Sequence, residues 1–179
     1  MNIHLAVAPY SVEALNKGLW LVILHAERIP PHIGIMFAGN YNSLTIKTRE
    51  TNINSELLIK TINQKKIKTI FLQIAEHPVF SLQHQLDIFQ EHLAGFNVVK
   101  QYEATCLSPI KLFFQEFYAI PLKENDLLLN FVQKLHDNQF IVSASSLNFE
   151  LNNGISLPYY TITELNDKIK SERQNLYND

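Results

Sequence analysis

Two short apolar segments on either side of a proline-bearing loop place the strictest limit on the fold of this chain. They are Gly18 to Leu24 (GLWLVIL) and His32 to Phe37 (HIGIMF), and both are rich in aliphatic and aromatic side chains. Such short apolar runs are typical of buried strands. The connection between them, His25 to Pro31, holds two prolines, which lack the amide proton that a central strand needs. We therefore expect two neighbouring strands joined by a loop.

The rest of the chain alternates between further strands and amphipathic helices. Gly39, Asn40 and Asn42 are expected to form a turn before a third strand over Leu44 to Lys47, which completes a hairpin. Other strands are predicted at Thr69 to Ala75, Asn97 to Tyr102 and Phe140 to Phe149. Helices are predicted from an N-cap at Asn54 to the lysines near Lys65, and at Ser81 to Leu93, Ser108 to Ala119, Leu127 to His136 and Thr163 to Leu176.

These elements predict one α+β domain over residues 1–179, with a small and mostly antiparallel sheet packed against helices. The last ten or so residues are expected to fray. With 46% apolar residues, the chain has enough material for a substantial core.

Composition excludes several classes of protein. Fifteen basic and seventeen acidic residues give a net charge of −2, so no nucleic-acid partner is expected. No apolar run approaches the roughly 20 residues that cross a bilayer, and the N-terminus has no basic leader, so we predict no integral membrane segment. The single cysteine suits a reducing compartment, and we expect a cytoplasmic protein. The absence of a glycine-rich phosphate loop and of several thiols predicts no cofactor.

Two residues hold positions that suit nucleophilic and acid–base catalysis. His32 begins the second apolar strand, where its imidazole can project from the edge of the sheet, and Gly34 lets another segment approach closely. Cys106 stands just before the helix that begins at Ser108. The unpaired amides and the dipole of a helix start stabilise a thiolate, and a nearby imidazole can carry the proton during acyl transfer.

A strand that begins HIGI and precedes a cysteine opening a helix (TCLSPIKLFFQEFY) resembles the circularly permuted NlpC/P60 group. These papain-like thiol hydrolases and acyltransferases include the lecithin–retinol acyltransferase-like proteins. The resemblance covers about His32 to Tyr118 and implies a permuted papain-like arrangement. It implies that Cys106 is the nucleophile, that His32 is the general base, and that the Cys106 amide contributes to the oxyanion hole. It also implies an amide or ester substrate, either peptide-like or lipid.

The group usually has a third polar residue on the strand after the histidine. Here that stretch offers only Ser43 and Thr45, which can orient His32 through a hydrogen bond but cannot stabilise an imidazolium as a carboxylate does. This departure supports an alternative function, a non-catalytic binding or interaction module on the same scaffold.

Two further alternatives concern other residues. His25, Glu27 and His32 could form the site of a metal-dependent hydrolase, although their spacing matches no established metal motif. Tyr159 and Tyr160 could line a substrate groove. Because no membrane anchor is visible, we favour a small amide or peptide over a lipid as substrate, and we assign no oligomeric state.

Overall fold

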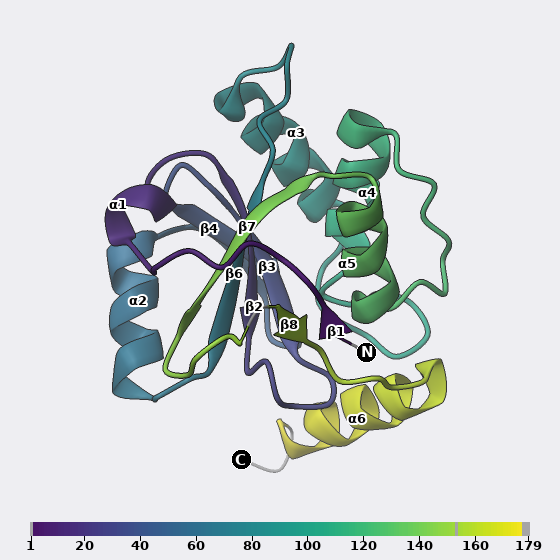
Figure 1. The fold of residues 1–179 in the computed structure, drawn as a ribbon. Coiled ribbons are helices and arrows are strands. Elements are labelled where there is room, and N and C mark those ends of the chain that lie inside the picture. Colours follow the sequence, from purple (N-terminus) through teal and green to yellow (C-terminus); the bar gives the residue numbers. More distant parts are fainter. Residues whose placement is uncertain (1, 153, 177–179) are drawn as a thin grey trace.

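The computed structural model describes residues 2–152 and 154–176 and confirms the α+β class, with a wholly antiparallel central sheet. The six strands of this sheet follow the order β5-β4-β3-β2-β6-β7 (Figure 1). Their bounds are β2 Leu19–Leu24, β3 His32–Phe37, β4 Asn40–Leu44, β5 Arg49–Asn54, β6 Thr69–Ile74 and β7 Ile141–Leu147. A separate two-stranded ribbon pairs β1 (Asn2–Ile3) with β8 (Ile155–Ser156).

Helices cover both faces of the sheet (Figure 1). Helices α1 (Val12–Leu15) and α2 (Ser55–Gln64) lie on one face. The other face is covered by α3 (Leu82–Ala94), α4 (Ser108–Tyr118) and α5 (Leu128–Asp137). The C-terminal helix α6 (Ile162–Asn175) lies across one end of the sheet. The last three residues of the segment expected to fray lie outside the described part of the chain.

The central position of β2 in the sheet explains why its sequence is apolar at every position. It pairs with β3 on one side and with β6 on the other, so neither edge meets water. Leu19, Leu21 and Ile23 face the α3–α5 side, whereas Trp20 and Val22 face α1 and α2. A strand buried on both faces needs apolar side chains throughout. The two expected strands on either side of the proline loop are confirmed.

Side-chain caps fix the starts of α2, α3 and α6, and the N-cap predicted at Asn54 is confirmed. The Asn54 side chain accepts a hydrogen bond from the Glu56 amide at 2.8 Å, at the start of α2. Ser81 caps α3 in the same way, and Thr161 forms a reciprocal capping box with Glu164 at the start of α6. Each cap satisfies amides that the first helical turn leaves without partners.

Two strand predictions need correction, and one strand of the central sheet was not predicted. The third strand is β4, which begins at Asn40 and ends at Leu44, so the predicted turn residues Asn40 and Asn42 lie within it. Strand β5 was not predicted, because its sequence RETNIN is polar and mostly exposed at the sheet edge. Residues 97–102 form turns instead of a strand, with only one isolated bridge between Lys100 and Ala104.

The outer side of β7 is occupied by an N-terminal segment. Val7 forms a parallel bridge with Ala144, supported by two backbone hydrogen bonds of 2.8 Å that involve Ala6 and Ala8. Among the described residues, no helix combines the length and the apolar character needed to cross a membrane.

Candidate functional site

His32 occupies the first position of β3, at the end of the sheet where β3 and β4 separate. Pairing between the two strands covers Ile35 to Phe37 and stops before His32. At Gly34, a Cβ atom would collide with the ring of Tyr41, so the close approach predicted for this glycine is confirmed. The Tyr41 ring fills that space and is fully buried, and its hydroxyl has no hydrogen-bond partner among the described residues.

Cys106 lies in the turn that leads into α4, and its neighbours hold this turn in place. The Ser108 hydroxyl accepts a hydrogen bond from the Thr105 amide at 2.9 Å, and the Thr105 hydroxyl accepts one from the Leu107 amide at 3.2 Å. The thiol is half-buried. Burial raises its pKa, although hydrogen bonding from the backbone amides of Ile33, Cys106 and Leu107 acts in the opposite direction.

The contact between the thiol and the Ile33 amide places Cys106 beside the residue that follows His32. Both predicted site residues also line one cavity of about 310 Å³. The structure thus places these two residues, which are far apart in the sequence, on the wall of one cavity, but no hydrogen bond joins the imidazole to the thiol. Burial, followed by the nearby His25, lowers the pKa of His32 to about 4, so the imidazole is uncharged at neutral pH. Its Nε2 has no hydrogen-bond partner among the described residues.

The two residues expected to orient His32 form hydrogen bonds elsewhere. Ser43 donates from its hydroxyl to Oε2 of Glu50 at 2.5 Å. Thr45 lines the 310 Å³ cavity, but its hydroxyl donates to the carbonyl of Thr48 at 2.9 Å. Neither hydroxyl is directed to the His32 ring, so the orienting role predicted for them has no hydrogen bond to support it.

Three charged residues on the wall of this cavity were not found from the sequence. Glu50 lies on β5 opposite Ser43, Arg28 lies in the loop before β3, and Glu172 lies on α6. Glu50 belongs to a strand that the sequence did not predict. Arg28 and Glu172 stand in segments with no motif, so only the packing of α6 against the β2–β3 loop could identify them.

A second cavity, of about 810 Å³, begins at the same cysteine. Cys106, Thr105, Pro31 and Leu165 line both cavities. The larger one extends between α4, α6 and the segment before α5, and its apolar wall includes Phe96, Leu107, Leu122, Leu127, Tyr160 and Leu165. Its volume falls within the range of small-molecule binding sites. Tyr160 meets the prediction that it lines a groove, whereas Tyr159 is exposed.

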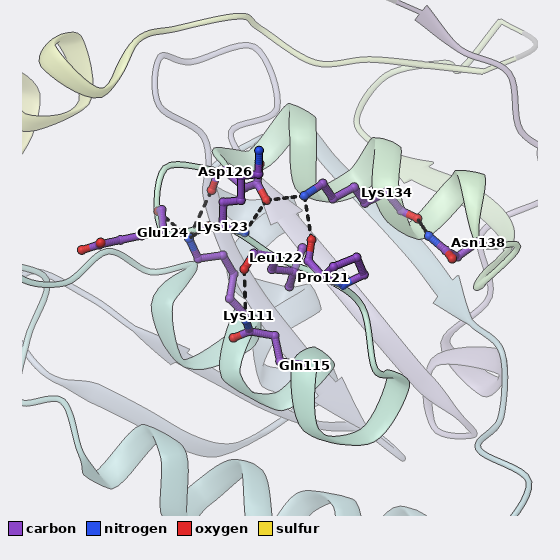
Figure 2. A network of polar contacts seen from close by, with 9 residues as sticks. All are labelled: Lys111, Gln115, Pro121, Leu122, Lys123, Glu124, Asp126, Lys134 and Asn138. Atoms are coloured by element: carbon purple, nitrogen blue, oxygen red, sulfur yellow. Dashed lines mark hydrogen bonds and ion pairs between the residues drawn. The ribbon is translucent and has the colours of Figure 1, made fainter.

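The outer wall of the larger cavity is held by two lysines (Figure 2). Lys111 donates from Nζ to three backbone carbonyls, those of Lys123 at 2.9 Å, Glu124 at 2.7 Å and Asp126 at 3.4 Å. Lys134 donates to the Pro121 carbonyl at 2.8 Å and to Oδ2 of Asp126 at 2.6 Å. Burial lowers the pKa of Lys111 although acidic groups stand nearby. The two lysines fasten residues 121–126 onto α4 and α5.

The metal alternative finds no geometric support. Within residues 2–152 and 154–176, no three histidine, cysteine or acidic side chains are grouped so that they could hold a metal ion. His25 is close enough to His32 to lower its pKa, but Glu27 is exposed to solvent.

Comparison of the chain with protein-family models, with curated proteins and with solved structures finds no match. The resemblance to the permuted NlpC/P60 group therefore stays a prediction, and the function has to be argued from the site itself.

Proposed function

We propose that the protein is a cysteine-dependent hydrolase or acyltransferase in which Cys106 is the nucleophile and His32 the general base. One observation carries the proposal: both side chains line one cavity, and the thiol lies beside the amide of the residue that follows His32. The permuted papain-like arrangement is part of this proposal and rests on the order of the same two residues along the chain.

The reaction begins with transfer of the Cys106 proton to His32 as the sulfur attacks an amide or ester carbonyl. The carbonyl carbon then carries a negatively charged oxygen, which the backbone amide of Cys106 can stabilise. His32 gives the proton to the leaving nitrogen or oxygen, and a thioester remains on Cys106. Water or another acceptor then attacks the thioester, with His32 again taking and returning the proton.

The electrostatics favour a neutral resting pair. His32 is uncharged at neutral pH because its pKa is about 4, and burial raises the pKa of the Cys106 thiol. A neutral imidazole with a free Nε2 can accept a proton, but no stable thiolate–imidazolium pair is expected before substrate arrives.

The larger cavity favours an acyl group with an apolar tail. Its wall is mostly apolar, and Cys106 is one of its lining residues, so an acyl group bound to sulfur can extend into it. Burial of an acyl chain is favourable by about 0.8 kcal/mol for each CH₂ group. Between the peptide-like and lipid substrates considered from the sequence, this cavity supports an apolar acyl donor, although a short peptide with apolar side chains would also fit its volume.

Mass spectrometry after exposure to p-nitrophenyl dodecanoate tests the proposal. The wild-type protein should gain one dodecanoyl group on Cys106, and Cys106→Ala should gain none at that site. His84→Gln, which changes an exposed histidine on α3, is the matched control and should be acylated like the wild type.

Iodoacetamide provides a second measurement. Because the thiol pKa is raised, alkylation of Cys106 in the folded protein should be slow at pH 7 and should accelerate only at a higher pH than alkylation of the same thiol in the unfolded protein. A wild-type protein that is not acylated, and whose thiol reacts only after unfolding, would contradict the enzyme proposal and favour the non-catalytic binding module.

A further inference from the structure

The smaller cavity contains polar groups whose bonding capacity is not used within the protein. Nε2 of His32 is buried without a partner among the described residues. Arg28 lines the cavity as an exposed residue, and its guanidinium forms no hydrogen bond or ion pair with any other described residue. Glu50 receives one hydrogen bond, from Ser43, and Glu172 has only Lys168 of its own helix at 3.8 Å.

The larger cavity is different, because several polar side chains on its wall already have partners in the protein. Lys111 donates to three carbonyls, and Gln115 donates to the Leu122 carbonyl at 3.1 Å. Asn166 accepts from the Tyr102 amide at 2.8 Å and donates to the Ile162 carbonyl at 2.9 Å. A ligand in this cavity gains little from polar atoms, whereas a ligand in the smaller cavity can satisfy groups that have no protein partner.

We propose that the smaller cavity binds the leaving group of the acyl substrate and that this group is an amino acid, so that the substrate is an N-acyl amino acid. The inference rests on the proposed role of Cys106, which the two cavities share. The apolar acyl chain occupies the larger cavity, and the scissile amide lies at the thiol. The carboxylate of the amino acid pairs with Arg28, since a guanidinium matches carboxylate geometry.

The charges of the cavity also select against other polar groups. Arg28, Glu50 and Glu172 all line this cavity, so a phosphate group with two negative charges would be repelled more strongly than a carboxylate with one. The N-acyl amino acid carries one carboxylate, which Arg28 can pair, and the amino acid released by cleavage also carries an ammonium, which Glu50 or Glu172 can pair. The volume of about 310 Å³ is at the low end for ligand sites, which suits one amino acid better than a longer peptide.

The cleavage step needs no other reactant than water. Sulfur bonds to the acyl carbon while His32 takes the thiol proton, and the C–N bond breaks as His32 gives that proton to nitrogen. The amine leaves, gains a further proton from solvent, and becomes an ammonium attracted by Glu50. Water then adds to the thioester, the C–S bond breaks, and the proton returns to the thiol through His32.

Binding to the inactive Cys106→Ala variant tests the inference without turnover. Calorimetry would compare N-dodecanoylglycine with N-ethyldodecanamide, which has the same chain and amide but no carboxylate, below the concentration at which either forms micelles. We expect the glycine conjugate to bind about tenfold more tightly. Adding Arg28→Gln should remove this preference, and adding Lys60→Gln, an exposed lysine on α2, should preserve it.

Equal affinity for the two ligands, or a preference that survives Arg28→Gln, would overturn the assignment of the smaller cavity. This result is distinguishable from failure of the proposed function, because acylation of wild-type Cys106 by p-nitrophenyl dodecanoate does not depend on an amino-acid leaving group. Wild-type protein should also release glycine from N-dodecanoylglycine. Preferential binding without glycine release would contradict the role of the amino acid as leaving group.

Discussion

The two cavities that meet at Cys106 differ in the state of their polar groups. In the larger cavity, lysine, glutamine and asparagine side chains are bonded to backbone groups and help to build the wall. In the smaller cavity, Nε2 of His32 and the Arg28 guanidinium have no partner among the described residues. Polar residues that line a cavity therefore fall into two kinds. Those with hydrogen-bond partners in the protein shape the cavity, and those without such partners determine which ligand chemistry it accepts.

The largest expected effect concerns His32, which belongs to the smaller cavity alone. His32→Gln should slow acylation of Cys106 by about 100- to 10,000-fold, since the variant lacks the general base. Binding of an apolar ligand in the larger cavity should not change. Stopped-flow release of p-nitrophenol measures the first effect, with His84→Gln as the control. If the affinity for the apolar ligand fell by the same factor as the acylation rate, the two cavities would not have separate functions.

Acid should destabilise the fold through the smaller cavity. His32 has a pKa of about 4 in the folded protein and about 6.5 when unfolded, so the unfolded state binds the proton more readily between these values. The stability contribution is complete above pH 6.5 and is lost as the pH falls toward 4, by about 3 kcal/mol.

Urea unfolding at several pH values measures this loss. The stability of His32→Gln should depend less steeply on pH than that of the wild type, whereas His84→Gln should keep the wild-type slope. Parallel curves for all three proteins would show that the His32 ring is not buried in its neutral form.

The wall of the larger cavity should depend on Lys111. Replacing it with methionine keeps most of the side-chain volume but leaves three carbonyls without their donor (Figure 2). We expect a loss of about 2 kcal/mol in the free energy of unfolding, measured with urea. Lys123→Met makes the same change at an exposed position of the same segment and should cost less than about 0.5 kcal/mol. Equal effects would show that the Lys111 bonds do not hold the wall.

The smallest effect concerns chain length in the larger cavity. For Cys106→Ala, each CH₂ added to an N-acylglycine should increase affinity by at most about fourfold, until the chain fills the space. Leu112 is 40% exposed on the cavity wall, so Leu112→Trp should make affinity level off at a shorter chain. Calorimetry over a series of chain lengths measures this limit. An unchanged limit in Leu112→Trp would place the acyl chain elsewhere.

The sequence predicted the parts of the fold that depend on local chemistry. The apolar runs of β2 and β3 and the Asn54 cap act over a few residues, so they can be recognised without the structure. Strand β4 was misplaced because Asn42 normally favours turns. Here its side chain is buried and accepts a hydrogen bond from the Asn52 amide at 3.0 Å, a contact with a strand that the sequence did not predict.

The candidate site was also predicted only in part, because some of its residues are brought there by strand pairing and helix packing that the sequence did not predict. His32 and Cys106 could be selected because each begins an element, and each position has a physical consequence for chemistry. Glu50 became visible only with the pairing of β4 and β5, and Glu172 only with the packing of α6. Contacts between distant segments leave no local pattern, so the charges that distinguish the two cavities had to come from the structure.

The N-terminal segment beside β7 has a consequence for how molecules of this protein meet one another. By bonding to Ala144 on both sides, Ala6 and Ala8 occupy backbone groups that would otherwise be open to a strand from another copy. At the opposite margin, β5 contains Asn52 with a positive φ of 53° and lies next to a register shift in β4. One margin is blocked and the other is irregular, which disfavours edge-to-edge aggregation at high protein concentration.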